Sequence, residues 1–255
     1  MESLTPTLLL MLVGVALMAG AVDAVAGGGG LLTLPALLLA QVPPVNALAT
    51  NKLQSCFGTF TSAVSMYRGG LAGSVKMTVP FFCALGGSAV GTIMVQFLDA
   101  SALTLLVPIV LATIALYFIF MPKYTDAERE PKMGTGLYHS VVIPGIGFYD
   151  GTIGGGTGSF FTAAGISLRG QRIVPASAQA RIMNFGTNIA SLVVFAFSGK
   201  MLWLVGGAMA VGQVVGAYLG ATAVSRGGAR LVRPVVVVIC LAMLVQYLWQ
   251  QGWLF

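Results

Sequence analysis

Four ionisable residues stand inside stretches of the sequence that are otherwise apolar. Asp23 and Asp150 each lie four residues before a glycine run, and Lys52 and Arg181 each follow in the next long apolar stretch. A charged residue at the centre of a membrane helix costs about 2.5–3.5 kcal/mol to insert. Their cost and their matched order indicate a functional site. The cations are suited to binding an anion, and the carboxylates are suited to carrying a proton.

The glycine runs indicate how the backbone contributes to such a site. Glycine is unfavourable inside a helix, so helices that begin near Leu31 and Gly158 would present unpaired amides and a positive dipole end to an anion. The predicted substrate-binding residues are Gly28, Gly29, Gly30, Asn51, Lys52, Gly155, Gly156, Arg181 and Asn184. Asp23 and Asp150 are the candidates for proton coupling. No metal site and no cofactor is predicted.

Each of these residues also has a simpler interpretation. Lys52 and Arg181 could extend their side chains along the helix to a lipid headgroup. Asp23 and Asp150 could cap helices or neutralise the two cations. Asn51 and Asn184 could form hydrogen bonds between helices without contacting a substrate.

Composition identifies the environment in which these residues must be held. Of 255 residues, 57% are hydrophobic and 8% are charged, whereas a soluble domain has about 25% charged residues. The apolar runs are continuous and long, which favours membrane helices over the alternating strands of a β-barrel. The basic residues stand at the ends of these runs, so the net charge of +6 indicates membrane topology and not nucleic-acid binding.

The sequence divides into two related halves. Besides the acid, the glycine run and the cation, Gly87 and Gly91 of the first half correspond to Gly212 and Gly216 of the second, and we expect these glycines to pack helices closely. We predict a first transmembrane repeat at 1–122, a cytoplasmic linker at 123–136 and a second transmembrane repeat at 137–255.

The predicted fold is an all-α polytopic membrane protein with two inverted-topology repeats. Each repeat has a glycine-broken pair of short helices, re-entrant or crossing, followed by three transmembrane helices. In the second half the short pair is Leu137–Tyr149 and Gly158–Leu168. The longer helices are predicted at Val45–Tyr67, Val75–Leu98, Ser101–Met121, Ala176–Phe197, Met201–Val224 and Leu231–Trp253.

Positively charged residues set the orientation, because Lys and Arg concentrate in cytoplasmic loops. With inverted repeats, one face holds ten of them and the other holds Lys200 alone. The ten are Arg68, Lys76, Lys123, Arg129, Lys132, Arg169, Arg172, Arg226, Arg230 and Arg233. If each glycine segment changed sides instead, the same residues would divide six to five. The sequence therefore predicts inverted halves with both termini outside the cytoplasm.

Three segments carry a resemblance to a known family: the segment that starts at Asp23 (DAVAGGGGLLTLPAL), the segment that starts at Asn46 (NALATNKLQ), and the segment that starts at Gly147 (GFYDG). Over essentially its whole length the chain resembles the TauE/SafE family of membrane transporters, and its YfcA-like branch in particular. The resemblance implies an inner-membrane permease for sulfur-containing anions such as sulfite or organosulfonates. It also implies that the glycine-rich tips and Thr50, Asn51 and Lys52 line the substrate path.

Two other functions fit parts of the pattern. A passive anion channel would use the same lining as a transporter. An intramembrane aspartyl protease would use Asp23 and Asp150 as its acids, but it leaves Lys52 and Arg181 unexplained, and we predict that the protein is not an enzyme. The expected partners are a small anionic substrate and the lipid bilayer, and not nucleic acid. A homodimer is left open.

Overall fold

The computed structural model describes residues 5–73, 75–98 and 128–225. Within these ranges all regular secondary structure is helical. This confirms the predicted all-α class. The predicted helices Ser101–Met121 and Leu231–Trp253 lie outside the described residues.

The first half contributes α1 (Pro6–Ala26), α2 (Gly30–Leu39), α3 (Pro44–Arg68) and α4 (Thr78–Val95). At the start of α1, the Thr5 side chain accepts a hydrogen bond from the Leu8 amide, and Pro6 occupies the first turn, where no amide is needed. Helix α1 ends at Gly27, whose φ of 80° is left-handed. With 21 residues, α1 is longer than the short arm we expected, because the glycine run follows its last turn and does not interrupt it.

The second half contributes α6 (Thr135–Leu137), the π-helical turn η1 (Tyr138–Val142), α7 (Ile143–Thr152), α8 (Thr157–Arg169), α9 (Ile173–Ala196) and α10 (Trp203–Ser225). The first three follow one another without a break. The π-helical turn comes just before Pro144, whose ring does not fit the interior of a regular α-helix. The arm predicted at Leu137–Tyr149 is therefore extended by a few residues at both ends. Helix α8 matches its prediction to within one residue at each end.

The surface and interior are those of a membrane-embedded protein. Among the described residues, three segments are long and apolar enough to cross a bilayer: Pro6–Ala26, Thr78–Val95 and Trp203–Ala223. Large apolar side chains point outward, with Phe97 82% and Phe197 89% exposed. Helices α3 and α9 have 25 and 24 residues, as many as a membrane-spanning helix needs, but they differ from those three segments because they bury many polar side chains. Many polar side chains of α3 and α9 therefore lie inside the bundle.

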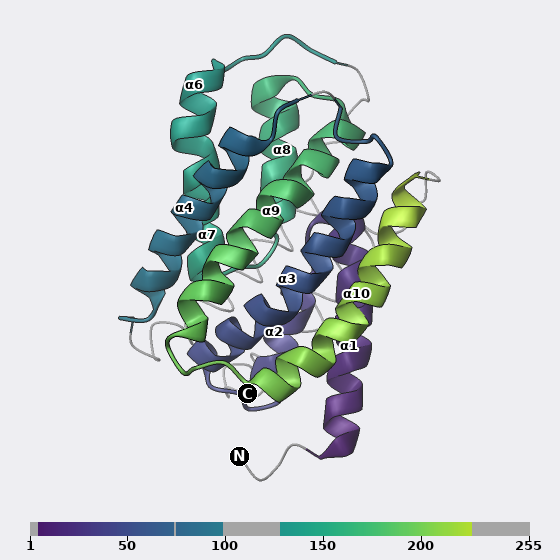
Figure 1. Ribbon diagram of the computed structural model, residues 1–255, viewed down its shortest axis with the longest axis vertical. Coiled ribbons are helices and arrows are strands. Elements are labelled where there is room, and N and C mark those ends of the chain that lie inside the picture. The colour runs from purple at the N-terminus through teal and green to yellow at the C-terminus, as the bar shows by residue number, and fades with distance from the viewer. Residues whose placement is uncertain (1–4, 74, 99–127, 226–255) are drawn as a thin grey trace, which may run out of the picture.

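Helices α3 and α9 occupy the middle of the bundle. Helices α4 and α7 lie on one side of them, and α1 and α10 lie on the other (Figure 1). The packing is reciprocal between the halves, because α1 packs on α10, the counterpart of α4, and α4 packs on α7, the counterpart of α1. In Figure 1, α1 and α3 run upward while α7 and α9 run downward.

Each glycine-broken pair doubles back on itself. At the end of α8, the Leu168 carbonyl accepts hydrogen bonds from the amides of Lys132 and Met133, just before α6 begins. In the first half, Leu37 and Val42 at the end of α2 share an apolar cluster with Leu12 near the start of α1. The tips of both pairs, where the glycines lie, therefore point into the bundle.

Glycines make the reciprocal packing close enough for backbone contact. A Cβ atom on Gly87 or Gly91 of α4 would overlap the carbonyl groups of Pro144 or Phe148 on α7. A Cβ on Gly216 of α10 would overlap the Leu17 carbonyl on α1 in the same way. The packing role predicted for these glycines is confirmed.

The α4–α7 contact allows a matched pair of substitutions. Gly87→Ala is expected to destabilise the protein by about 1–3 kcal/mol, the usual cost of overpacking, because its Cβ meets backbone that cannot move alone. The neighbouring Gly86→Ala is the control, since a Cβ there has no atom within 4 Å. Thermal unfolding of the purified variants in detergent measures the difference. Equal midpoints for both variants would contradict close packing at Gly87.

Candidate functional site

The two glycine segments meet inside the bundle. The Ser159 amide of α8 donates a hydrogen bond of 3.3 Å to the Gly27 carbonyl, and its hydroxyl donates to the Ala26 carbonyl. A Cβ on Gly30 would lie 2.6 Å from the Gly154 carbonyl oxygen. The tip of the first pair is thus in backbone contact with the tip of the second, and this contact depends on glycine.

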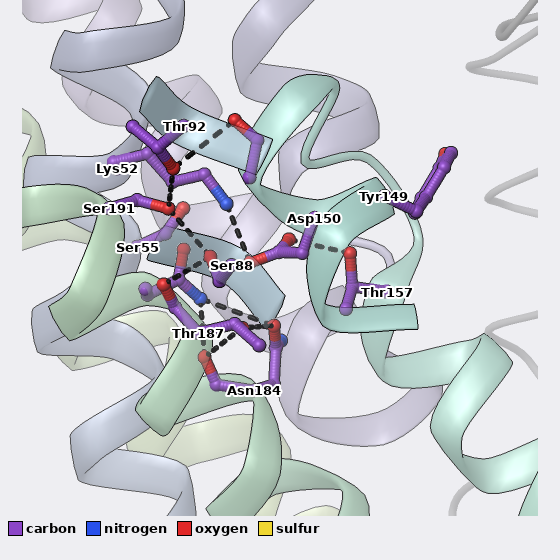
Figure 2. A network of polar contacts seen from close by, with 12 residues as sticks. Lys52, Ser55, Ser88, Thr92, Tyr149, Asp150, Thr157, Asn184, Thr187 and Ser191 are labelled. Atoms are coloured by element: carbon purple, nitrogen blue, oxygen red, sulfur yellow. Dashed lines mark hydrogen bonds and ion pairs between the residues drawn. The ribbon is translucent and has the colours of Figure 1, made fainter. Parts of the chain in front are cut away.

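Lys52 on α3 forms an ion pair with Asp150 on α7. Lys52 Nζ lies 2.6 Å from Asp150 Oδ2, and both side chains are buried. Figure 2 shows Lys52 pointing toward the carboxylate, while the Thr157 hydroxyl donates to Asp150 Oδ1 over 2.6 Å. Both carboxylate oxygens of Asp150 therefore lie against a donor group.

Arg181 on α9 lies beside Asp23 on α1 in a looser arrangement. Arg181 Nη1 is 3.8 Å from Asp23 Oδ1, and that oxygen accepts a hydrogen bond of 3.2 Å from the Gly29 amide. The guanidinium is fully buried, yet its three nitrogens have no hydrogen-bond partner in the described part of the chain, nor does Asp23 Oδ2. Arg181 carries five N–H donors. It is therefore a buried cation with unused donor capacity.

The two ion pairs are exchanged between the halves. Asp23 of the first half faces Arg181 of the second, and Asp150 of the second faces Lys52 of the first. Lys52 and Arg181 each stand eight residues after the first residue of their helix and are 0% exposed. They turn to buried carboxylates and not to a headgroup, so the snorkelling interpretation is wrong for this conformation.

A small polar cavity lies between the glycine tips and the central helices. Its volume is about 10 Å³, which holds about one water molecule. The residues that line it are Asp23, Gly27, Gly30, Ser55, Thr59, Gly154, Gly156, Thr157, Asn184 and Asn188. Arg181 adjoins this lining, because a Cβ on Gly158, the residue after Thr157, would overlap its Nη1. Four of the predicted site residues thus line one cavity: Asp23, Gly30, Gly156 and Asn184.

The other predicted residues support the site from nearby. Asn51 Oδ1 accepts hydrogen bonds from the Thr33 hydroxyl, at 2.5 Å, and from the Gln54 amide, at 2.9 Å, so Asn51 links α3 to α2. The carbonyls of Gly28 and Gly155 accept hydrogen bonds from the Leu31 amide and the Tyr149 hydroxyl, respectively. These contacts agree with the simpler interpretation of Asn51, in which its side chain forms a hydrogen bond between helices.

Several lining residues were missing from the predicted set, and helical spacing could have found them. Ser55 and Thr59 follow Lys52 by three and seven residues, as Asn184 and Asn188 follow Arg181. Residues at these spacings share one face of a helix. The same face of α3 and α9 therefore carries a cation and two neutral polar groups.

A hydroxyl cluster ties α4 to α9 and α7 next to this site. The Ser191 hydroxyl lies 2.8 Å from that of Ser88 and 2.7 Å from that of Thr92. Ser88 also donates to the Thr187 carbonyl, and Thr92 donates to the Gly151 carbonyl (Figure 2). These contacts fix α7, and with it Asp150, against the central helices.

Comparison with known proteins gives a consistent result. The family model described as "Sulfite exporter TauE/SafE" matches residues 12–247. A "Probable membrane transporter protein" of Haemophilus influenzae is 39% identical over 246 residues, covering 96% of each chain. "Probable membrane transporter protein YfcA" of Escherichia coli K12 is 38% identical, covering 96% of this chain and 91% of its own. A Sinorhizobium protein, "Probable membrane transporter protein ORF9", is 35% identical, covering 97% and 95%. No solved structure matches.

Proposed function

We propose that this chain, which belongs to the TauE/SafE family of membrane transporters, is a secondary transporter that moves a small oxyanion across the bilayer by alternating access. The relatives and the family are named as transporters and not as enzymes. The proposed substrate class is sulfite or an organosulfonate, moved out of the cell across the inner membrane. An ion gradient or exchange supplies the driving force.

The single observation that carries the anion assignment is the state of Arg181. A buried guanidinium with three nitrogens that lack hydrogen-bond partners provides donors for the oxygens of a sulfite or sulfonate anion. The starts of α2 and α8 lie beside it and add the positive ends of two helix dipoles. Ser55, Thr59, Asn184 and Asn188 add neutral polar groups to the lining of the adjoining cavity. Lys52 and Asn51 complete the proposed site on α3.

The small volume of the cavity and the exchanged ion pairs support alternating access. A cavity of about 10 Å³ is too small for an anion of several heavy atoms, so the two halves must separate to admit it. The contacts that would open are those between halves, which include both ion pairs and the Gly27–Ser159 hydrogen bond. In our proposal the halves are inverted repeats that rock against each other around this site.

The proposed orientation places the linker in the cytoplasm and both termini outside it. It rests on the distribution of Lys and Arg along the sequence. The described basic residues fit this orientation, because Arg68 ends α3 while Arg169 ends α8 beside the linker residue Met133. Lys200 lies before α10, where its carbonyl accepts a hydrogen bond from Asn46 at the start of α3. In this topology, that end of the bundle faces outward.

A counterflow experiment tests transport and separates it from passive conduction. Proteoliposomes loaded with unlabelled sulfite or methanesulfonate are expected to take up the labelled anion several-fold faster than empty proteoliposomes. The site of an alternating-access protein returns to the outside faster when it binds an unlabelled anion from inside the liposome. The rate of uptake through a channel does not increase in this way. Protein-free liposomes are the control. Uptake that is indifferent to the internal anion and accompanied by conductance in a planar bilayer would identify a channel.

A further inference from the structure

The two buried carboxylates are held in different ways, although they occupy corresponding positions. Both oxygens of Asp150 have donors, one from Lys52 and one from Thr157, each at 2.6 Å. Asp23 has one weak amide bond of 3.2 Å and a guanidinium at 3.8 Å, and its second oxygen has no partner in the described residues. Asp150 is tied in place, whereas Asp23 is held loosely.

Asp23 also stands where the site would bind an anion. Its Oδ1 accepts a hydrogen bond from the amide of Gly29, the residue just before α2, and lies next to Arg181, and its side chain lines the cavity. These are the features that favour an anion at a helix start, and the buried guanidinium without hydrogen-bond partners is a second, independent feature that calls for one. The carboxylate of Asp23 therefore fills the place of an external anion.

We propose, on the basis of the transport function above, that Asp23 is a tethered substitute for the substrate anion and that it leaves this place by taking up one proton, so that anion and proton are bound together. The proton comes from the water on the side to which the site is open and joins the carboxylate to form the neutral acid. The anion then takes over the Arg181 donors and the α2 amide. On the opposite side both leave, and Asp23 returns to Arg181.

The charge count of the interior supports one proton for each monovalent anion. Among the described residues, the buried charged side chains are Asp23, Lys52, Asp150 and Arg181, whose charges sum to zero. Adding a monovalent anion would leave one uncompensated negative charge in a low-dielectric interior, which is strongly unfavourable. Protonation of Asp23 restores neutrality. Protonation of Asp150 would do so only by breaking its contact with Lys52.

Among the described residues, no other group around Asp23 is placed to take this role. Helix α1 packs on α2, α3, α8, α9 and α10. Helix α2 has no ionisable residue, α8 has Arg169 at its far end, and α10 has the exposed Tyr218 within its described part. The groups on the other elements are Arg181 on α9, and Lys52, Cys56, Tyr67 and Arg68 on α3, with Asp150 behind them on α7. Asp23 is the carboxylate beside the unsatisfied cation.

The test compares anion affinity in the wild-type protein and in Asp23→Asn across a range of pH. Affinity for sulfite and for methanesulfonate is measured on purified protein in detergent. At each pH, the affinity of Asp23→Asn for one anion is divided by that of the wild type. Protonation of the anion itself affects both affinities equally, so it does not change this ratio. Asp23→Asn is expected to bind more tightly than wild type at high pH, and the ratio is expected to rise by up to about tenfold per pH unit, the slope of a one-proton linkage. Arg68→Ala, at the exposed end of α3 and away from the site, is expected to keep the pH dependence of the wild type.

Direct proton counting makes the result independent of the variants. In weakly buffered solution, wild-type protein is expected to take up about one proton for each methanesulfonate bound, and Asp23→Glu is expected to do the same. Anion binding without proton uptake, or an affinity ratio that is constant with pH, would overturn the role of Asp23 while leaving transport intact. If neither anion binds at any pH, the proposed function fails as well.

Discussion

Replacing Arg181 with alanine is expected to lower anion affinity about 100-fold and to reduce flux in proportion. The reason is that Arg181 is a buried cation whose three nitrogens have no hydrogen-bond partner among the described residues, and its ion pair with Asp23 is a loose one of 3.8 Å. Each charge-assisted hydrogen bond to a charged group contributes about 1.5–3 kcal/mol, so losing two costs at least about 3 kcal/mol. A factor of ten corresponds to about 1.4 kcal/mol. Isothermal titration of the purified protein with sulfite or methanesulfonate gives the affinity directly.

Two further variants separate lost binding from lost folding. Arg181→Ala leaves Asp23 buried without its cation, which is itself destabilising. The double variant Arg181→Ala/Asp23→Asn removes both charges and keeps the interior neutral, so its unfolding midpoint should lie nearer to the wild type while its affinity stays low. Arg68→Ala, at the exposed end of α3, removes an arginine away from the site and should bind normally. A folded double variant with near wild-type affinity would refute the role of Arg181.

The second large effect is expected at Lys52. Lys52→Met breaks the buried ion pair with Asp150 and leaves a carboxylate without its cation. Breaking such a pair from one side costs about 3–5 kcal/mol. For a chain of this size, each kcal/mol shifts the unfolding midpoint by about 2–4 °C, so we expect a decrease of roughly 10 °C. Thermal unfolding in detergent, followed by the loss of monodisperse protein, measures the change.

A double-mutant cycle tests whether the pair is the cause. Asp150→Asn alone should also destabilise the protein, because Lys52 is then buried without its counter-charge. The double variant Lys52→Met/Asp150→Asn has no buried charge at this position and should be more stable than the sum of the single effects predicts. The Asn side chain can still accept the hydrogen bond from Thr157. Strictly additive effects would mean that Lys52 and Asp150 do not interact energetically.

Most of the described helices and the four charged residues inside the bundle were predictable from local sequence. Helix α3 was predicted at Val45–Tyr67 and observed at Pro44–Arg68, because the prolines at its start and the glycine after its last residue mark its two ends. The acids and the cations were identified by their cost in a membrane, and the glycine runs by their low helix propensity. Family membership also followed from these motifs, which the match over residues 12–247 bears out.

It was less predictable which neutral polar residues line the cavity. Asn51 was selected as a substrate-binding residue and stays in the proposed site, and its side-chain oxygen accepts hydrogen bonds from Thr33 and Gln54. Ser55 and Thr59 were not selected and line the cavity. The face of a helix that turns toward a cavity depends on where its neighbours pack, and the neighbours of α3 come from both halves of the chain.

The sequence by itself determined which charged residues are buried, since these four stand inside otherwise apolar stretches and not at their ends. Only the tertiary structure decided how they are paired. Asp23 precedes Lys52 in one half and Asp150 precedes Arg181 in the other, so the order along the chain is equally compatible with pairing within each half. The folded chain pairs them across the halves, with Lys52 close to Asp150 and Arg181 more distant from Asp23. The physical reason is that the two glycine tips meet in backbone contact inside the bundle. Each tip therefore places its carboxylate beside the central helix of the opposite half.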